Sequence, residues 1–121
     1  MEYHSIVWKR SEKHPEVEFA VARISLARRI ELGKKVREVG CKEEFLQAGK
    51  SFQEEIEAGI LRRQIERIYL EWGFVQIRGL SIDGSEADPA LVIERGPEEL
   101  IQEILAAIRS ELHLTEEERK N

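Results

Sequence analysis

The chain has 121 residues, which is enough for one domain that buries roughly two thirds of the surface exposed by its unfolded form. Its 19 basic and 24 acidic residues give a net charge of −5, which disfavours non-specific binding of the whole molecule to nucleic acid. Cys41 is the only cysteine and no apolar run is long enough to span a membrane, so we expect a soluble, cytoplasmic protein without an intrachain disulfide.

The N-terminal segment carries the two-residue alternation that is typical of strands. Ile6 and Trp8 alternate with polar or outward positions, and in residues 17–21 apolar side chains alternate with glutamate and alanine. Between these stretches lies Pro15, which pushes His14 out of the helical region of backbone conformation. The sequence therefore predicts a β-hairpin at the N-terminus.

A first helix is predicted after this hairpin. Ser25 is a good N-cap, and the apolar pattern that follows indicates a helix to about Val39. Gly33 lies on the apolar face, where a missing side chain would let another element cross closely, and Gly40 predicts an interruption of the helix. The apolar face consists of Leu26, Ile30, Leu32, Val36 and Val39.

This helix lies in a basic stretch of the chain. From Arg23 to Lys42 there are seven basic residues and two acidic ones, whereas the later part of the chain is acidic. The basic side chains project around the whole helix, and no aromatic residues that could stack on bases lie among them. We therefore expect a solvated face or a docking face for an acidic protein, with Arg28, Arg29 and Lys35 as candidate contacts.

A longer helix is predicted from Phe52 to Trp72. Ser51 and Glu54 have the spacing of a capping box, in which each side chain accepts a hydrogen bond from the other residue's backbone amide. Two apolar stripes follow, and one covered face cannot hold both, so one stripe is sandwiched in the domain or shared with a partner. The sequence leaves open which stripe faces inward; our hypothesis assigns the first to a partner. The first stripe is Phe52, Ile56 and Ile60, and the second is Leu61, Ile65, Ile68 and Trp72.

The helical period changes to a two-residue period immediately after Trp72. Gly73 is expected to end the helix in a left-handed cap conformation, and a strand is predicted near 74–82. Gly79 absorbs a one-residue slip in the alternation, which indicates a bulge or bend. Residues 83–84 then form a turn. We expect this strand to join the N-terminal hairpin in a small antiparallel sheet.

The C-terminal part of the chain predicts one short helix and one long helix. Asp88 followed by proline is typical of a helix start, and Gly96 indicates the end of the short helix. Pro97 opens the last helix, and the charged residues 115–121 are expected to form a mobile tail. The buried stripe expected for the last helix is Leu100, Ile101, Ile104, Leu105, Ile108 and Leu112.

Together these elements predict an α+β fold that is mostly α-helical, with three or four helices and a small antiparallel sheet. The sheet consists of the N-terminal hairpin and the strand near 74–82. A single domain over residues 1–121 is expected, because no Gly-, Ser- or Pro-rich linker and no internal repeat divides the chain.

No set of residues predicts catalysis, a cofactor or a metal. Gly49-Lys50-Ser51 matches the last three residues of the phosphate-binding loop motif. The motif also requires a glycine five residues before Gly49, and this chain has Glu44 there. The three histidines lie in separate segments, which is against a site with three metal ligands. Cys41 is more typical of a small buried residue than of a nucleophile. We expect a protein that is not an enzyme and binds no cofactor.

The order of motifs from Trp72 onward resembles a known family. A helix ends in Trp72-Gly73, a Gly-Leu-Ser-Ile-Asp-Gly turn follows at residues 79–84, Asp88-Pro89 begins a short segment, and Gly96-Pro97-Glu98-Glu99 opens the final helix. With short N-terminal strands and a longer helix before it, this arrangement is similar to that of the small tail assembly chaperones of tailed bacteriophages and prophages. The resemblance implies a non-enzymatic protein of the bacterial host cytoplasm that coats the tape-measure protein and recruits tail-tube subunits.

A second interpretation stays open from the residues alone. A surplus apolar stripe can also join copies of one chain, and charge that is basic early and acidic late favours head-to-tail self-association. The alternative is therefore a homo-oligomeric helical interaction or regulatory module, in which the basic helix binds nucleic acid. Salt-sensitive binding of DNA would distinguish this alternative.

Overall fold

The computed structural model describes the backbone of residues 1–48 and 51–120 and the side chains of residues 1–39 and 51–112. In the described backbone the chain forms four helices, a three-stranded antiparallel sheet and a separate two-stranded one. This content confirms the predicted α+β class, mostly helical with a small antiparallel sheet.

Two compact units divide the chain. The sheet unit consists of Met1–Ile24 and Leu70–Asn121, and the hairpin unit consists of Ser25–Tyr69. The expectation of one domain over residues 1–121 stays a prediction, because two compact units can still unfold as one cooperative domain.

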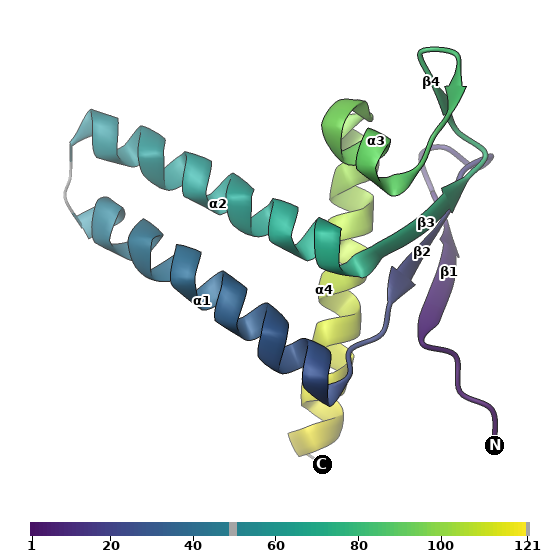
Figure 1. Ribbon diagram of the computed structural model, residues 1–121, viewed down its shortest axis with the longest axis horizontal. Helices are drawn as coiled ribbons and strands as arrows, with labels where there is room; N and C mark the ends of the chain where they lie inside the picture. The colour runs from purple at the N-terminus through teal and green to yellow at the C-terminus, as the bar shows by residue number, and fades with distance from the viewer. Residues whose placement is uncertain (49–50, 121) are drawn as a thin grey trace. The chain divides into compact units, whose positions relative to one another are not determined.

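Three antiparallel strands form the base of the sheet unit. They are β1 (Ile6–Arg10), β2 (Glu18–Ala22) and β3 (Phe74–Arg78), and β2 lies between the other two (Figure 1). Trp8 pairs with Ala20 across β1 and β2. The predicted N-terminal hairpin and its pairing with the later strand are both confirmed.

β3 is shorter than the strand predicted near 74–82. At Gly79 the backbone takes a φ of 84°, and a Cβ there would collide with the carbonyl oxygen of Glu16. This left-handed conformation turns the chain out of the sheet. The next residues form a separate pair of short strands, β4 (Ser81–Ile82) and β5 (Ser85–Glu86). The slip in the alternation is therefore the end of a strand and not a bulge within one.

The role expected for Gly73 is wrong. The helix α2 (Phe52–Gly73) includes this glycine, which does not have a positive φ, and β3 follows directly. A Cβ on Gly73 would lie only 3.0 Å from side-chain carbons of Ile108. The glycine is thus explained by the close approach of the last helix and not by a left-handed cap.

The last helix, α4 (Glu98–Lys120), packs against β2 and supplies the centre of the core of the sheet unit. Complete burial of a leucine or isoleucine side chain contributes about 1.5–3 kcal/mol. Four side chains of the predicted stripe are completely buried, and the other two, Ile101 and Leu112, are half-buried. The four buried residues are Leu100, Ile104, Leu105 and Ile108.

The short helix α3 (Pro89–Arg95) begins as the sequence predicts. A side-chain oxygen of Asp88 accepts a hydrogen bond from the backbone amide of Leu91 at 2.8 Å, which satisfies one of the unpaired amides at the helix start. Gly96 ends the helix, and its amide donates to the carbonyl oxygen of Val92 at 2.8 Å.

The last helix extends into the segment that was expected to form a mobile tail. α4 continues through Lys120, and Asn121 lies outside the described residues. The mobility of residues 115–121 stays a prediction.

The hairpin unit consists of two antiparallel helices (Figure 1), α1 (Leu26–Ala48) and the part of α2 that ends at Tyr69. The Ser25 hydroxyl accepts from the amide of Arg28 at 3.2 Å, and the Ser51 hydroxyl accepts from the amide of Glu54 at 3.0 Å. These bonds confirm the two serines as N-caps.

Two expectations for glycines in α1 are wrong. Gly40 does not interrupt the helix, which continues to Ala48. One internal glycine costs about 1 kcal/mol relative to alanine, and a long helix can tolerate this cost. Gly33 is exposed, and no atom lies within 4 Å of where its Cβ would be. No element of the described chain therefore crosses α1 closely at that residue.

The broad apolar face expected for α1 is covered only in part. Leu32 is buried and Val36 and Val39 are half-buried, but Leu26 and Ile30 are exposed. At about 100° per residue, Leu26 and Ile30 point more than about 100° away from Leu32 around the helix axis. A single neighbouring helix covers one stripe, so the expected face is split between interior and solvent.

Candidate interaction surfaces

Three large apolar side chains on α2 lie in solvent. Phe52, Ile56 and Ile60 are 79%, 50% and 54% exposed, and at about 100° per residue they fall within an arc of about 80°. We call these three residues the outer stripe. Leu61 and Ile65, on roughly the opposite side of the helix, are half-buried. The exposure of the outer stripe is what a partner-binding role requires, while binding itself stays a prediction.

The arc of the outer stripe becomes basic further along α2. Arg63 and Arg67 fall within the same arc and are exposed. A guanidinium nitrogen of Arg63 lies 3.3 Å from a carboxylate oxygen of Glu66, an exposed pair that contributes little to stability. A partner that covers this side of α2 therefore contacts apolar side chains in the N-terminal half of the helix and basic side chains further toward its C-terminal end.

The other helix of the hairpin unit adds two exposed apolar residues. Leu26 and Ile30 are 70% and 54% exposed on α1. Soluble proteins rarely leave several large apolar side chains in solvent on a small unit unless that surface binds something. The hairpin unit is therefore the strongest candidate for an interaction surface in the described chain.

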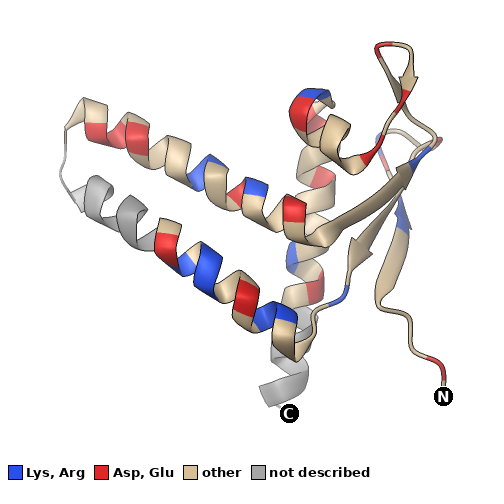
Figure 2. Cartoon of the chain, in the orientation of Figure 1, with Lys and Arg blue, Asp and Glu red and all other residues tan. Residues whose placement is uncertain are grey.

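The three basic candidates on α1 do not form one patch. Arg28 and Lys35 point in similar directions and are exposed, whereas Arg29 is half-buried and points roughly 100° away from Arg28. The Lys35 ammonium lies 3.7 Å from a carboxylate oxygen of Glu31. Figure 2 shows acidic and basic residues interspersed along the described part of α1. This arrangement favours a solvated helix with local ion pairs over a continuous nucleic-acid surface.

One face of the sheet carries a polar cluster that sequence reasoning missed. The Arg78 guanidinium lies 4.2 Å from the centre of the Trp8 ring. Glu18 accepts hydrogen bonds from Arg78 at 2.7 Å and from Arg10 at 3.2 Å, and these bonds lower the pKa of its carboxyl group. Because the register places Arg10, Glu18 and Arg78 in one row, this cluster could have been found only with the strand pairing in hand.

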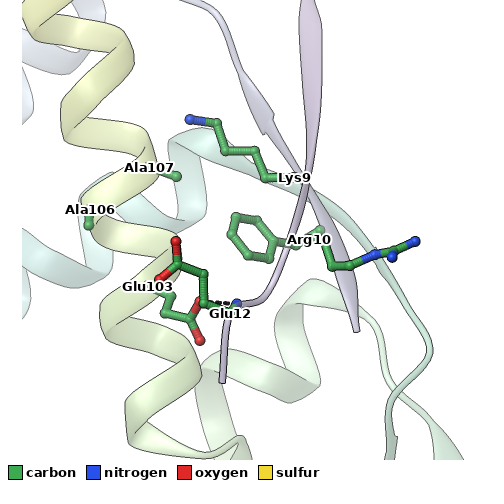
Figure 3. A pocket seen from close by; sticks show the side chains of 7 residues that line it. Lys9, Arg10, Glu12, Glu103, Ala106 and Ala107 are labelled. Atoms are coloured by element: carbon green, nitrogen blue, oxygen red, sulfur yellow. Dashed lines mark hydrogen bonds between the residues drawn. The ribbon is translucent and has the colours of Figure 1, made fainter. Parts of the chain in front are cut away.

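A pocket of about 260 Å³ lies between β1 and α4 in the sheet unit. Figure 3 shows Lys9 reaching from β1 toward α4, while Arg10 points away from that helix. The pocket combines basic, acidic and apolar residues in its lining. It is lined by Lys9 and Arg10, by Glu12 and Glu103, and by Phe19, Ala106 and Ala107.

Hydrogen bonds from the loop after β1 hold the Glu103 side chain of α4 in place at this pocket. Its two carboxylate oxygens accept hydrogen bonds from the buried Ser11 hydroxyl at 2.7 Å and from the Glu12 amide at 3.0 Å. Partial burial of Glu103 opposes ionisation, but these bonds outweigh it, and the net effect lowers the pKa of the carboxyl group. More than 90 residues separate these partners, so no local pattern predicts the contact.

The described residues contain no group of three or more histidine, cysteine, aspartate or glutamate side chains placed to hold a metal ion. Within the same part of the chain, no helix is long and apolar enough to cross a membrane. The side chains of Cys41 and Lys50, which the sequence analysis weighed for catalysis and phosphate binding, lie outside the described residues.

No protein-family model matches the chain, and comparisons with curated proteins and with solved structures find no significant match.

Proposed function

We propose that the protein is a non-enzymatic tail assembly chaperone of a tailed bacteriophage or prophage. It acts in the cytoplasm of the bacterial host and binds the tape-measure protein and tail-tube subunits. The order of its elements supports this proposal: two N-terminal strands precede two long helices, a Gly-Leu-Ser-Ile-Asp-Gly turn and a final amphipathic helix. This is the arrangement on which the family resemblance rests.

The observation that carries the proposal is the exposed outer stripe. A tape-measure protein is very long and prone to aggregate, because its apolar helix faces have no partner before the tail forms. An apolar stripe on a stable helix can cover such a face until assembly. Arg63 and Arg67, which continue the arc, favour a client that carries acidic residues beside its apolar ones.

The size of the stripe favours weak binding at many sites. Covering the exposed parts of its three side chains contributes about 3–6 kcal/mol in total, which only matches the lower end of the about 4–15 kcal/mol lost in translational and rotational freedom on association. A single contact of this kind is weak and reversible. Many copies along one long client would coat it and still release it when tail-tube subunits arrive.

Gene context and co-purification test the proposal. We expect genes for a tail-tube protein and a very long tape-measure protein beside the gene for this chain. When the tagged full chain is expressed with that tape-measure protein, several copies should co-purify with each client. The absence of such neighbours, or of co-purification in gentle buffer, would contradict the proposal.

Self-association is a second candidate function, because the same stripe can pair with its own copy. Light scattering of the purified chain at about 100 μM separates the two candidates. An oligomer that dissociates in the Ile56→Asp variant would favour self-association as the primary role. No salt-sensitive binding to DNA is expected in either case, because Arg28, Arg29 and Lys35 do not form one patch and Lys35 pairs with Glu31.

A further inference from the structure

β1 leaves one row of backbone groups without a partner in the described chain. It is the outer strand of the sheet, and at its end the Ser11 amide donates to the carbonyl oxygen of Val17 at 3.0 Å. Hydrogen-bonded pairs alternate along antiparallel strands, so the odd-numbered residues of β1 face β2. The even-numbered residues 6, 8 and 10 therefore turn their N–H and C=O groups toward the free edge, where another strand can pair with them.

The pocket lies beside this free edge. Lys9 pairs with Phe19, so both side chains lie on the same face of the sheet, and both line the pocket together with residues of α4. A strand added to β1 would continue the sheet, and every second side chain would point to that face. One of these side chains would meet the mouth of the pocket, with its neighbours on the same face about 7 Å away on either side.

The lining of the pocket includes two charged side chains that form neither a hydrogen bond nor an ion pair within the described part of the chain. They are the Lys9 ammonium on β1 and the Glu12 carboxylate in the loop after it. Figure 3 shows Lys9 and Glu12 on different sides of the pocket, and Phe19, Ala106 and Ala107 supply the apolar part of its lining. This placement of charges favours a partner with an apolar side chain flanked by an acid on one side and a base on the other.

We propose that β1 and this pocket form a groove that binds an extended peptide segment by strand addition. One apolar side chain of the segment fills the pocket. An acidic residue two positions away lies beside Lys9, and a basic residue two positions away on the other side lies beside Glu12. Main-chain hydrogen bonds to β1 supply affinity, and the side chains supply selectivity. The proposal concerns the sheet unit alone and does not rest on the proposed chaperone function.

A second copy of β1 fits this groove less well than such a segment. In an antiparallel pair centred on Trp8, the side chains on the pocket face come from Val7 and Lys9 of the second copy. This pair provides no acid for Lys9 and no base for Glu12. The two charges therefore favour a different chain as the occupant.

Two synthetic peptides test the proposal with the full chain. They are fluorescein-labelled Thr-Asp-Thr-Leu-Thr-Lys-Thr and the reverse order Thr-Lys-Thr-Leu-Thr-Asp-Thr, because the added strand can run in either direction. We expect saturable binding of one peptide in fluorescence anisotropy at concentrations up to about 1 mM. Replacing its leucine by aspartate should weaken binding at least about tenfold.

Protein variants locate the bound peptide. Ala106 is exposed and lines the pocket, so Ala106→Leu should reduce binding at least about tenfold, while Ala90→Leu on α3 should leave it unchanged. Lys9→Glu should reverse the preference, so that a peptide with lysine in place of aspartate binds better. Arg10→Pro should abolish binding, because proline lacks the backbone N–H group that residue 10 turns toward the free edge and that would donate to the added strand. Arg10→Ala keeps this N–H group and should retain most binding.

The proposal is overturned if neither peptide binds, or if binding is indifferent to both Ala106→Leu and Lys9→Glu. A dimer of the wild-type chain that Arg10→Pro dissociates would also overturn it, because the edge would then belong to a second copy. In the absence of any binding, Lys9 and Arg10 would instead be charges that keep an exposed strand edge from aggregating.

Discussion

At Gly79 the structure depends on the absence of a side chain for two reasons, a φ of 84° and contact with the backbone of Glu16. Gly79→Ala should therefore reduce the free energy of unfolding by more than about 2 kcal/mol, because both strain and collision must be relieved. Gly84 is a matched control with a φ of 82° and open space around its Cβ position. Gly84→Ala should cost only about 1 kcal/mol. Equal losses in urea unfolding would show that the contact with Glu16 does not matter.

Glu103 should make part of the stability depend on pH. Its folded-state pKa is lowered from the ordinary value of 4.5, so its contribution is complete above that pH and is lost as the pH falls through the lower folded-state value. Glu103→Gln should therefore destabilise the chain at neutral pH, by about 1 kcal/mol for a charged hydrogen bond screened by solvent. The difference from wild type should shrink as the pH falls below 4.5 and through the lower folded-state pKa.

Thermal melts of both proteins between neutral pH and about pH 3 check this expectation. The difference between the two curves isolates Glu103 from Glu18, whose pKa is also lowered and which titrates in the same range. A difference that stays constant across the range would contradict the assigned role of Glu103.

Glycine was the residue type whose role the sequence predicted least well. Gly96 marks the end of an element as expected. Gly79 ends β3 where a bulge or bend within a longer strand was expected, Gly73 is explained by its close approach to Ile108, and Gly40 lies within a continuous helix. The expected conformational role requires a positive φ, and sequence alone does not distinguish that need from close packing or from simple tolerance. The caps at Ser25, Ser51 and Asp88 were predictable because their partners lie three residues away.

At the scale of elements, α2 offers a direct comparison between its two sides. Ile56 belongs to the exposed outer stripe, and Ile65 is half-buried on the opposite side. Ile56→Asp should change the free energy of unfolding by no more than about 0.5 kcal/mol. Ile65→Asp should cost on the order of 3 kcal/mol, because it removes an apolar contact and leaves a charge poorly solvated.

Thermal unfolding followed by far-UV circular dichroism measures both changes. Loss of helix in the Ile56→Asp variant at room temperature would show that the outer stripe belongs to the core. Ile60→Asp serves as a replicate at a second position of the same stripe.

The elements that the sequence predicted best are those with one buried face. The stripe on α4 was predictable because a single sheet covers it and the helical period stays clear. On α1 the same reasoning placed Leu26 and Ile30 with Leu32, although only Leu32 is buried. Periodicity shows which residues share a side of a helix, but it does not show how wide an arc the neighbouring element covers.

At the scale of the whole chain, the candidate surfaces were predictable to different degrees. The outer stripe was available from spacing alone, since Phe52, Ile56 and Ile60 repeat every four residues. The pocket between β1 and α4 was not, because Lys9 and Glu103 come together only when α4 packs on the sheet. Surfaces made within one element can be read from sequence, whereas those made between distant segments depend on the fold.

The proposed chaperone activity predicts that the outer stripe keeps the tape-measure protein in solution. The direct measurement is the fraction of that client in the supernatant after co-expression with the full chain. The variant is Ile56→Asp combined with Ile60→Asp. The matched control is Val75→Asp, which places the same charge at an exposed apolar residue of β3 outside the stripe.

Wild type and the Val75→Asp control should keep most of the client soluble, whereas the double variant should leave it in the pellet although its own circular dichroism spectrum is unchanged. A double variant that is folded and protects the client as well as wild type does would contradict the role assigned to the outer stripe.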